Sequence, residues 1–306
     1  MTSLPFFSII MPVYNKEPYI RDTIASVLAQ TYSSYEVVMI GGVSSDGTDQ
    51  ICQEFATAEP NRFRFLIQTG NGVSNARNDG ILAARGKYVA FLDADDLWVP
   101  EYLDMMAHLI RDFPEAIFYV SGFSRLYADK TVINCPKPPL RGYIDYFQHT
   151  PWVHTSALIV ERETIVRIGL FKTEYPLGED IDLMIRLALH GNAAYEPTIL
   201  EVHKIGVPGS LCTSGTKNDY LPVPGNSELF AAERTPSLIL FHDKQILGTA
   251  MANLDRGYPN EARKQLKGVS NWSTKLLIYR IASYLPTSAF LQIHSWYNRN
   301  VWKRKI

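Results

Sequence analysis

The sequence predicts an α/β protein with a mainly parallel sheet flanked by helices. In the first part of the chain, runs of β-branched and aromatic side chains alternate with segments whose apolar residues recur at helical spacing. Each intervening segment is long enough for a crossover helix, the connection that joins parallel strands. The chain has 306 residues and is 46% hydrophobic, so it can bury one large core or two modest ones.

Four strands and three helices are expected first. The strands cover residues 6–13, 35–40, 62–67 and 88–92, and the helices cover residues 19–30, 48–56 and 73–84. Thr48 or Asp46 should cap the second helix, because their side-chain oxygens can accept hydrogen bonds from the free N–H groups of a first turn. In sheets of this kind, ligands bind beyond the carboxyl ends of the strands.

After residue 100 the pattern becomes mixed and then wholly helical. Strands are expected at 117–123 and 154–161, helices at 101–112, 162–169 and 178–191, and a proline-rich loop at 135–143. From residue 226 onward we expect no strand and three helices, at 259–269, 273–285 and 287–302. The sequence therefore predicts a Rossmann-like domain over residues 1–225 and a helical extension over residues 226–306.

The helical extension is strongly basic. Residues 256–306 contain ten Lys and Arg and one acidic residue, whereas the whole chain has a net charge of −1. Near its end, Trp296, Tyr297 and Trp302 are interleaved with cations. Aromatic rings among cations suit an anionic membrane surface, so residues 286–306 are a candidate contact with lipid. An ordinary solvated helix is the alternative, and no nucleic-acid-binding motif accompanies the charge.

Cysteine usage and the absence of targeting signals indicate the compartment. Cys52, Cys135 and Cys212 lie far apart with no CxxC pair, which argues against a disulfide framework or a zinc site. We expect them to be small buried hydrophobic residues. The N-terminal apolar run has no basic flank and no small-residue cleavage site, and no segment reaches the ~18 apolar residues of a membrane span. The sequence predicts a cytoplasmic protein, either soluble or peripheral to a membrane.

Three aspartates, Asp93, Asp95 and Asp96, directly follow the fourth expected strand. Carboxylates this close repel one another and need positive charge nearby. Mg²⁺ or Mn²⁺ bridging to phosphate oxygens would supply it. A solvated turn with an aspartate capping the next helix explains the spacing equally well.

Two other segments carry candidate site residues. Arg77 lies near the start of the third expected helix, where an arginine and the helix dipole together favour an anion such as a diphosphate. An ordinary surface arginine is the alternative. Glu179 and Asp180 begin the helix at 178–191. They are either first-turn residues stabilised by the dipole or a catalytic base at a loop–helix junction.

Taken in order, these segments resemble one family. "FSIIMPVYNKEPYIRDTIASVLAQTYSSYEVVMI", "SSDGT", "GVSNARNDGILAARGKYVAFLDADD" and "GEDIDLMIRLALHG" are similar to the family 2 glycosyltransferases of the GT-A fold. The resemblance runs from Phe7 to about His203, two thirds of the chain. Each motif is weak alone, but four in this order and spacing are specific.

The resemblance implies a nucleotide-sugar site at the carboxyl ends of the strands. Tyr14 should pack against the base, Arg77 should reach the base or the phosphates, and Asp93 should touch the ribose. Further donor contacts are implied for Pro12, Val13, Gly41 and Ala94.

The resemblance also implies the chemistry. Asp95 should bind Mn²⁺ or Mg²⁺ on the diphosphate, with His203 as a further metal ligand. Asp180 should be the base that deprotonates an acceptor hydroxyl, with Glu179 orienting it, and one such base implies inversion at the anomeric carbon. The expected acceptor is a glycan or a lipid-linked glycan of bacterial surface polysaccharide synthesis, at the inner face of the plasma membrane.

The sequence departs from the family pattern after the second strand. Gly41 and Gly42 stand where the family usually has an acid that hydrogen-bonds the base. Losing such a contact costs on the order of 1–3 kcal/mol. On this basis Gly41→Asp should tighten donor binding. The alternative function is a sugar-nucleotide-binding protein with impaired or no turnover.

Overall fold

The computed structural model describes residues 4–127, 131–133, 140–149, 153–175, 178–207, 236–255 and 258–267, and four single positions further on. The chain forms two compact units, Met1–Ser214 and Gly215–Ile306. Each unit is described by itself. The domain boundary predicted at residue 225 falls outside the described residues and stays a prediction.

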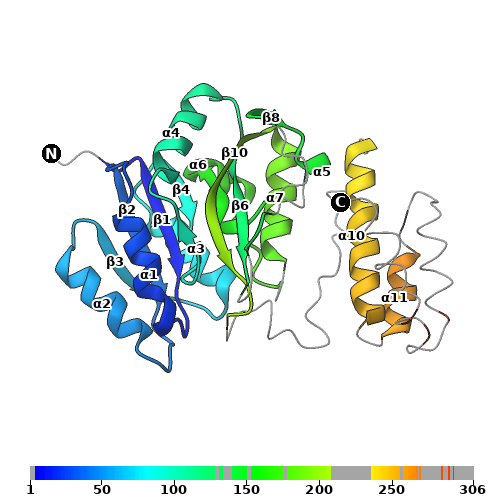
Figure 1. The fold of residues 1–306 in the computed structure, drawn as a ribbon, viewed down its shortest axis with the longest axis horizontal. Coiled ribbons are helices and arrows are strands. Elements are labelled where there is room, and N and C mark those ends of the chain that lie inside the picture. The colour runs from blue at the N-terminus through cyan, green and yellow to red at the C-terminus, as the bar shows by residue number, and fades with distance from the viewer. Residues whose placement is uncertain are drawn as a thin grey trace. The chain divides into compact units, whose positions relative to one another are not determined.

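The first unit contains the expected alternation of strands and helices (Figure 1). Its parallel strands are β1 (Phe7–Pro12), β2 (Tyr35–Gly41), β3 (Phe63–Ile67) and β4 (Tyr88–Phe91), in the order β3-β2-β1-β4. The connecting helices are α1 (Glu17–Leu28), α2 (Thr48–Ala58) and α3 (Val73–Ala83). Every one of these elements lies within two residues of its predicted bounds. The prediction that Thr48 or Asp46 caps α2 is wrong, because the N-cap residue is Gly47 and no side chain forms a cap hydrogen bond. Asp46 lies one residue earlier, and its Oδ1 accepts a hydrogen bond from the Thr48 N–H at 3.0 Å.

The sheet then becomes mixed. β9 (Leu158–Glu161) is antiparallel to β4 and to β6 (Phe118–Leu126), and β10 (Ala193–Lys204) is parallel to β6. The short strands β5 (Leu97–Trp98), β7 (Thr131–Ile133) and β8 (Gly142–Ile144) pair with β10, β6 and β10 respectively. β10 was not predicted. Its register shifts between Glu196 and Ile199, around a proline, and this irregularity breaks the apolar pattern by which a strand is identified.

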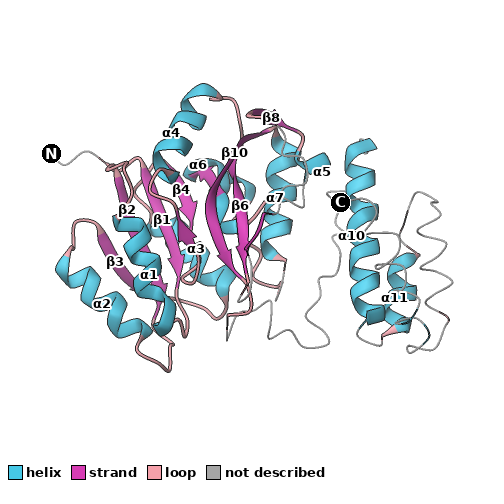
Figure 2. Ribbon diagram, in the orientation of Figure 1, coloured by secondary structure: helices cyan, strands magenta, loops and turns pink. Residues whose placement is uncertain are grey.

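The remaining helices of the first unit are α4 (Tyr102–Asp112), α5 (Tyr146–His149), α6 (Arg162–Ile168) and α7 (Glu179–His190). Of these, the short α5 lies next to α7 at one side of the sheet (Figure 2). The strand predicted at 154–161 begins instead with a 3₁₀ turn, η2 (Thr155–Ala157), and only β9 is extended. The predictions for α4, α6 and α7 are confirmed within one residue.

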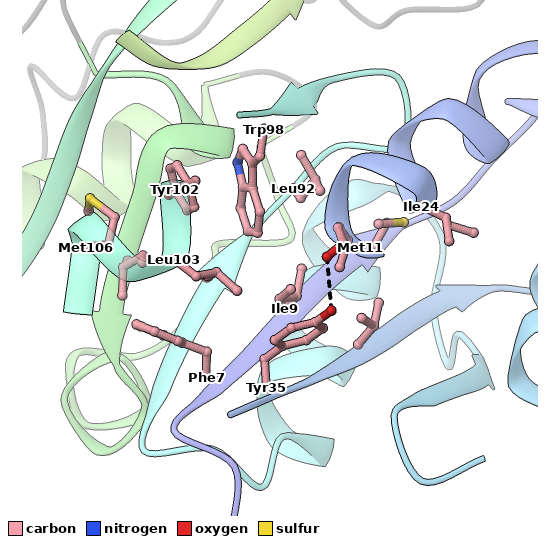
Figure 3. Close-up of a cluster of buried hydrophobic side chains, with 14 of the residues drawn as sticks. Phe7, Ile9, Met11, Ile24, Tyr35, Leu92, Trp98, Tyr102, Leu103 and Met106 are labelled. Carbon is pink, nitrogen blue, oxygen red and sulfur yellow. Dashed lines mark hydrogen bonds between the residues drawn. The ribbon is translucent and has the colours of Figure 1, made fainter. Parts of the chain in front are cut away.

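The core that supports the site lies between the sheet and helices α1 and α4 (Figure 3). Phe7, Ile9 and Met11 alternate along β1 and are fully buried, because every second side chain of a strand points to the same face. The rings of Trp98 and Tyr102 stack with centroids 4.0 Å apart. Leu92, before the acidic turn that follows β4, and Trp98, after it, belong to this same buried cluster.

Cys52 is the cysteine that lies within the described residues, and it is buried and free. Burial raises the pKa of its thiol to about 12. The thiol therefore stays protonated and packs as a small hydrophobic group, as predicted. Cys135 and Cys212 fall outside the described residues.

The second unit contains α10 (Pro236–Asp255) and α11 (Pro259–Leu266), which pack through Ala250, Leu254, Ala262 and Leu266. α11 confirms the first of the three predicted helices, whereas α10 was not predicted. The other two predicted helices, and the aromatic and basic residues near the chain end, fall outside the described residues. Within the described part, no helix is both long and apolar enough to cross a membrane.

Candidate active site

The loops that follow β1 and β2 are tied together at the carboxyl edge of the sheet. Asn15 has a left-handed backbone (φ 51°), and its side-chain oxygen accepts a hydrogen bond from the Ser45 N–H at 2.8 Å. The Lys16 N–H donates to Thr48 Oγ1 at 2.7 Å. Tyr14, the residue predicted to pack on a base, is 56% exposed. The tied loops therefore present its ring to solvent. Pro12 is half-buried, and Val13 and Ala94 are buried.

Two aspartates of the acidic turn after β4 have cationic partners within the protein. Lys16 Nζ lies 2.8 Å from Asp95 Oδ2, and Arg77 Nη2 lies 2.9 Å from Asp93 Oδ1. Burial raises the pKa of Asp95, and the charges of Asp96 and Asp93 add to the rise while Lys16 opposes it. The repulsion between neighbouring carboxylates that the sequence predicted therefore acts on Asp95, and the charge of Lys16 offsets only part of it. No sequence pattern pointed to Lys16.

Arg77 is buried and bridges two carboxylates. Besides its contact with Asp93, its Nη1 lies 2.7 Å from Glu179 Oε1, and its guanidinium lies 5.2 Å from the centroid of the Phe171 ring. Burial lowers the pKa of Arg77, but the two carboxylates outweigh burial and raise it overall. Arg77 is therefore not an ordinary surface arginine. Its bridge joins the acidic turn to the start of α7.

Glu179 and Asp180 begin α7 directly after Gly178, whose backbone is left-handed (φ 83°). Burial raises the pKa of Glu179, the charge of Asp180 adds to this, and Arg77 opposes it. Asp180 is half-buried. Its Oδ1 accepts a hydrogen bond from the Ile181 N–H at 2.8 Å, and its Oδ2 lies 3.4 Å from the Thr155 hydroxyl. The Glu179 carboxylate is thus buried inside the protein. The Asp180 carboxylate is held by hydrogen bonds but remains partly exposed.

The third aspartate of the turn, Asp96, belongs to a different cluster. His203 Nδ1 lies 3.0 Å from Asp96 Oδ1, and His154 Nδ1 lies 3.8 Å from Asp96 Oδ2 and 3.5 Å from Glu201 Oε2. Burial lowers the pKa of His154, but Glu201 and Asp96 outweigh burial and raise it to about 9. Burial raises the pKa of Glu201 to about 7, although His154 opposes the rise. These four residues could hold a metal ion.

Sequence reasoning did not identify Glu201 as part of the site. Glu201 and His203 are two residues apart on β10, so their side chains lie on the same face of the sheet. The signal was available in that spacing, but it required β10 to be recognised as a strand. His203 was expected to serve with Asp95. His203 contacts Asp96, the neighbour of Asp95 in the acidic turn, and its predicted role as a metal ligand stays a prediction.

Gly41 ends β2 in close contact with its surroundings. A Cβ added there would overlap Val13 Cγ2, and it would lie 3.0 Å from the Val13 carbonyl and 3.1 Å from Asp49 Oδ1. Asp49 Oδ1 is itself buried without a hydrogen-bond partner. At Gly42 the backbone is left-handed (φ 102°), and a Cβ would lie 2.6 Å from Ile67 Cδ1. The structure therefore has no room for the acid that the family usually places here.

We expect Gly41→Asp to destabilise the protein by about 1–3 kcal/mol, because it overpacks the contact with Val13 and adds a carboxylate beside Asp49. The expectation from the sequence that an aspartate here would tighten donor binding concerns affinity and not stability, and it stays a prediction. Urea denaturation measures the change. Gly41→Ala is the matched control, since it adds the Cβ without the charge and should lose less. A Gly41→Asp protein as stable as the wild type would contradict this reading of the site.

The sequence matches the family described as glycosyl transferase family 2 over residues 8–154. TuaG of Bacillus subtilis (strain 168), provisionally named a teichuronic acid biosynthesis glycosyltransferase, is 32% identical over 193 residues, which cover 62% of this chain and 75% of TuaG. The family match lies in the half of the chain that carries β1 to β4.

Two solved structures have the same arrangement of strands and helices. S. aureus TarS, residues 1–349 in complex with UDP-GlcNAc, superposes with a TM-score of 0.62 at 17% identity, covering 86% of this chain and 81% of TarS. The mannosyltransferase PcManGT of Pyrobaculum calidifontis, in complex with GDP-Man and Mn²⁺, superposes with a TM-score of 0.53 at 17% identity, covering 93% of this chain and 89% of PcManGT. At these identities the likeness shows the fold, which is GT-A. The family match over residues 8–154 and the 32% identity to TuaG, of which this chain covers 75%, show that the chain belongs to the family 2 glycosyltransferases.

Proposed function

We propose that this enzyme transfers a sugar from a nucleotide-diphosphate donor to a hydroxyl group of a glycan or lipid-linked acceptor, with inversion at the anomeric carbon. The observation that carries the proposal is the bridge from Asp93 through Arg77 to Glu179. It brings the candidate donor-binding turn and the candidate base, Asp180, to one edge of the sheet. TarS was solved with UDP-GlcNAc and PcManGT with GDP-Man, which supports a nucleotide sugar as donor.

Asp180 is the proposed general base. It is half-buried and lies in the first turn of α7, so an acceptor hydroxyl can approach its carboxylate. Removing the hydroxyl proton as the oxygen attacks contributes typically ~10²–10⁴-fold to the rate. Glu179, held by Arg77, fixes the start of α7 and so positions Asp180.

The residues of the acidic turn suit a divalent cation on the donor diphosphate. The pKa of Asp95 is raised by burial and by two neighbouring carboxylates, so added positive charge would be stabilised there. PcManGT was solved with Mn²⁺, which supports the same kind of ion. When bound, Mn²⁺ or Mg²⁺ neutralises charge on the leaving diphosphate. Lys16 holds the Asp95 carboxylate in place at 2.8 Å.

Donor recognition is proposed to use the loop after β1. Tyr14, with its exposed ring, would pack on the base, and Asp93 would contact the ribose. The proposal assigns one base and no enzyme nucleophile, so the sugar is transferred by a single displacement and its anomeric configuration inverts. Because TuaG is named for teichuronic acid biosynthesis, the proposed acceptor is a glycan of the bacterial cell envelope.

The test is a donor screen. UDP-, GDP- and dTDP-sugars are incubated with the enzyme and Mn²⁺, first for slow donor hydrolysis and then for transfer to glycan or lipid-linked acceptors. At least one donor should be consumed, and the product should have the inverted configuration by NMR. A product of retained configuration would refute single displacement, and failure of every donor to bind would refute the proposed site.

Residues 286–306 are proposed to bind an anionic membrane at the cytoplasmic face, because aromatic and basic side chains alternate there. The full chain should co-sediment with vesicles containing phosphatidylglycerol, and a chain ending at residue 285 should not. High salt should release the full chain, because the attraction is electrostatic. Equal pelleting of both forms would dismiss the tail as an anchor.

A further inference from the structure

Two buried residues of the 3₁₀ turn η2 contact both halves of the candidate site. The Ser156 hydroxyl donates a hydrogen bond to Asp96 Oδ2 at 2.7 Å and accepts one from the Asp93 N–H at 3.1 Å. The Ser156 carbonyl accepts a hydrogen bond from the Trp98 indole N–H at 2.7 Å. Ser156 is fully buried, and hydrogen bonds shielded from water are stronger than exposed ones. These bonds fasten η2 to the acidic turn after β4 and to β5.

The residue before Ser156 reaches the other half of the site. The Thr155 hydroxyl lies 3.4 Å from Oδ2 of Asp180, in the first turn of α7. An ionised carboxylate can only accept hydrogen bonds, so the hydroxyl is the donor. Thr155 is 2% exposed, and its side chain is branched at Cβ, which restricts its rotamers. The hydroxyl is therefore held in place relative to the acidic turn.

Asp180 thus has a separate hydrogen-bond donor for each of its carboxylate oxygens. Its Oδ1 accepts the Ile181 N–H at 2.8 Å, and its Oδ2 faces Thr155. A single hydrogen bond leaves a carboxylate free to turn about its Cβ–Cγ bond, whereas a second bond on the other oxygen fixes its plane. A general base must lie about 2.6–3.2 Å from the oxygen whose proton it removes, and catalytic hydrogen bonds often shorten when substrate binds. The distance of 3.4 Å from Thr155 fits that behaviour.

We propose that Thr155 is a positioning residue for sugar transfer: its hydroxyl fixes the Asp180 carboxylate in the orientation that removes the acceptor proton. This rests on the proposed function, in which Asp180 is the base. Because Ser156 is bonded to the acidic turn, Thr155 also links the base to the turn that is proposed to hold the donor. Misplacing a reacting group by about 1 Å can cost on the order of 10²-fold in rate. Losing this one hydroxyl should therefore lower kcat.

Thr155→Val tests the proposal, because valine keeps the branched shape and removes the hydroxyl. The assay uses the nucleotide sugar and the acceptor that the donor screen identifies. We expect kcat to fall by about 10- to 100-fold. The acceptor KM, and the donor affinity measured by calorimetry, should stay as in the wild type, because orienting the base stabilises the transition state without aiding binding. Thr155→Ser keeps the hydroxyl and should restore most of the rate.

Thr164→Val is the matched control. Thr164 is also buried, and its hydroxyl also donates to a carboxylate oxygen, Glu161 Oε2, at 3.1 Å. Glu161 has no role in the proposed reaction, so this variant should keep the wild-type kcat. A second comparison adds Thr155→Val to Asp180→Asn. The rate should not fall further, because substitutions that act through one group are not additive.

Three results would overturn the proposal. They are a Thr155→Val protein as fast as Thr164→Val, a Thr155→Ser protein as slow as Thr155→Val, and a loss from Thr155→Val that is as large in Asp180→Asn as in the wild type. Any of them, found beside a slow Asp180→Asn single variant, leaves the proposed function standing. An Asp180→Asn protein as fast as the wild type would reject the base itself, and the role of Thr155 with it.

Discussion

Asp180→Asn is expected to lower kcat for sugar transfer by about 10²–10⁴-fold, because asparagine cannot accept the proton of the acceptor hydroxyl. The side chain keeps its shape, and its amide oxygen can still accept the hydrogen bond from the Ile181 N–H. Donor affinity, measured by calorimetry with the nucleotide sugar, should be unchanged. The experiment compares initial rates at saturating donor and acceptor.

Asp104→Asn is the matched control for this loss. Asp104 also lies in the first turn of a helix, α4, and is also half-buried, so both substitutions remove one charge near a helix N-terminus. The control should keep the wild-type kcat. If Asp180→Asn turns over as fast as Asp104→Asn, Asp180 is not the base.

Arg77→Met is expected to reduce the free energy of unfolding by about 3–5 kcal/mol, because removing one partner of a buried ion pair leaves the other charges unpaired. Arg77 is buried and contacts Asp93 at 2.9 Å and Glu179 at 2.7 Å, so two carboxylates would lose their cation. Methionine retains much of the apolar bulk against the Phe171 ring. Urea denaturation followed by circular dichroism measures the change.

Arg21→Met shows how much of that loss comes from burial. Arg21 pairs with Glu54 at 2.8 Å, a similar distance, but its side chain is 57% exposed. Solvent screens such a pair, so its loss should change the free energy of unfolding far less than the loss of Arg77 does. The double variant Arg77→Met/Glu179→Gln should recover part of the stability of Arg77→Met, since one stranded charge is neutralised. Equal losses for Arg77→Met and Arg21→Met would show that the bridge is not needed for stability.

The parallel half of the sheet could be predicted because its signal is local. Each of β1 to β4 is a short apolar run, and each helix between them repeats apolar residues every three or four positions. β10 could not be found in this way. Its register shift between Glu196 and Ile199 breaks the alternation, and the strand is stabilised by pairing with β6, which is far away in the sequence.

The candidate site also has features that the sequence predicted and features that only the tertiary structure revealed. The spacing of Asp93, Asp95 and Asp96 after a strand pointed to positive charge in that turn, and the motif order pointed to Arg77 and Asp180. Which cation meets which aspartate depended on the tertiary structure: Lys16 contacts Asp95, Arg77 contacts Asp93, and the two histidines contact Asp96.

The amino-acid sequence by itself determined the order of β1 to β4 and their connecting helices, the acidic turn and the family, because these depend on short-range periodicity and on motifs of adjacent residues. The tertiary structure alone decided that Gly41 has no room for an aspartate, that Arg77 bridges two carboxylates, and that Glu201 is buried beside His154. The physical reason is that steric fit and charge pairing depend on distances of a few ångströms between residues many positions apart, which no local pattern encodes.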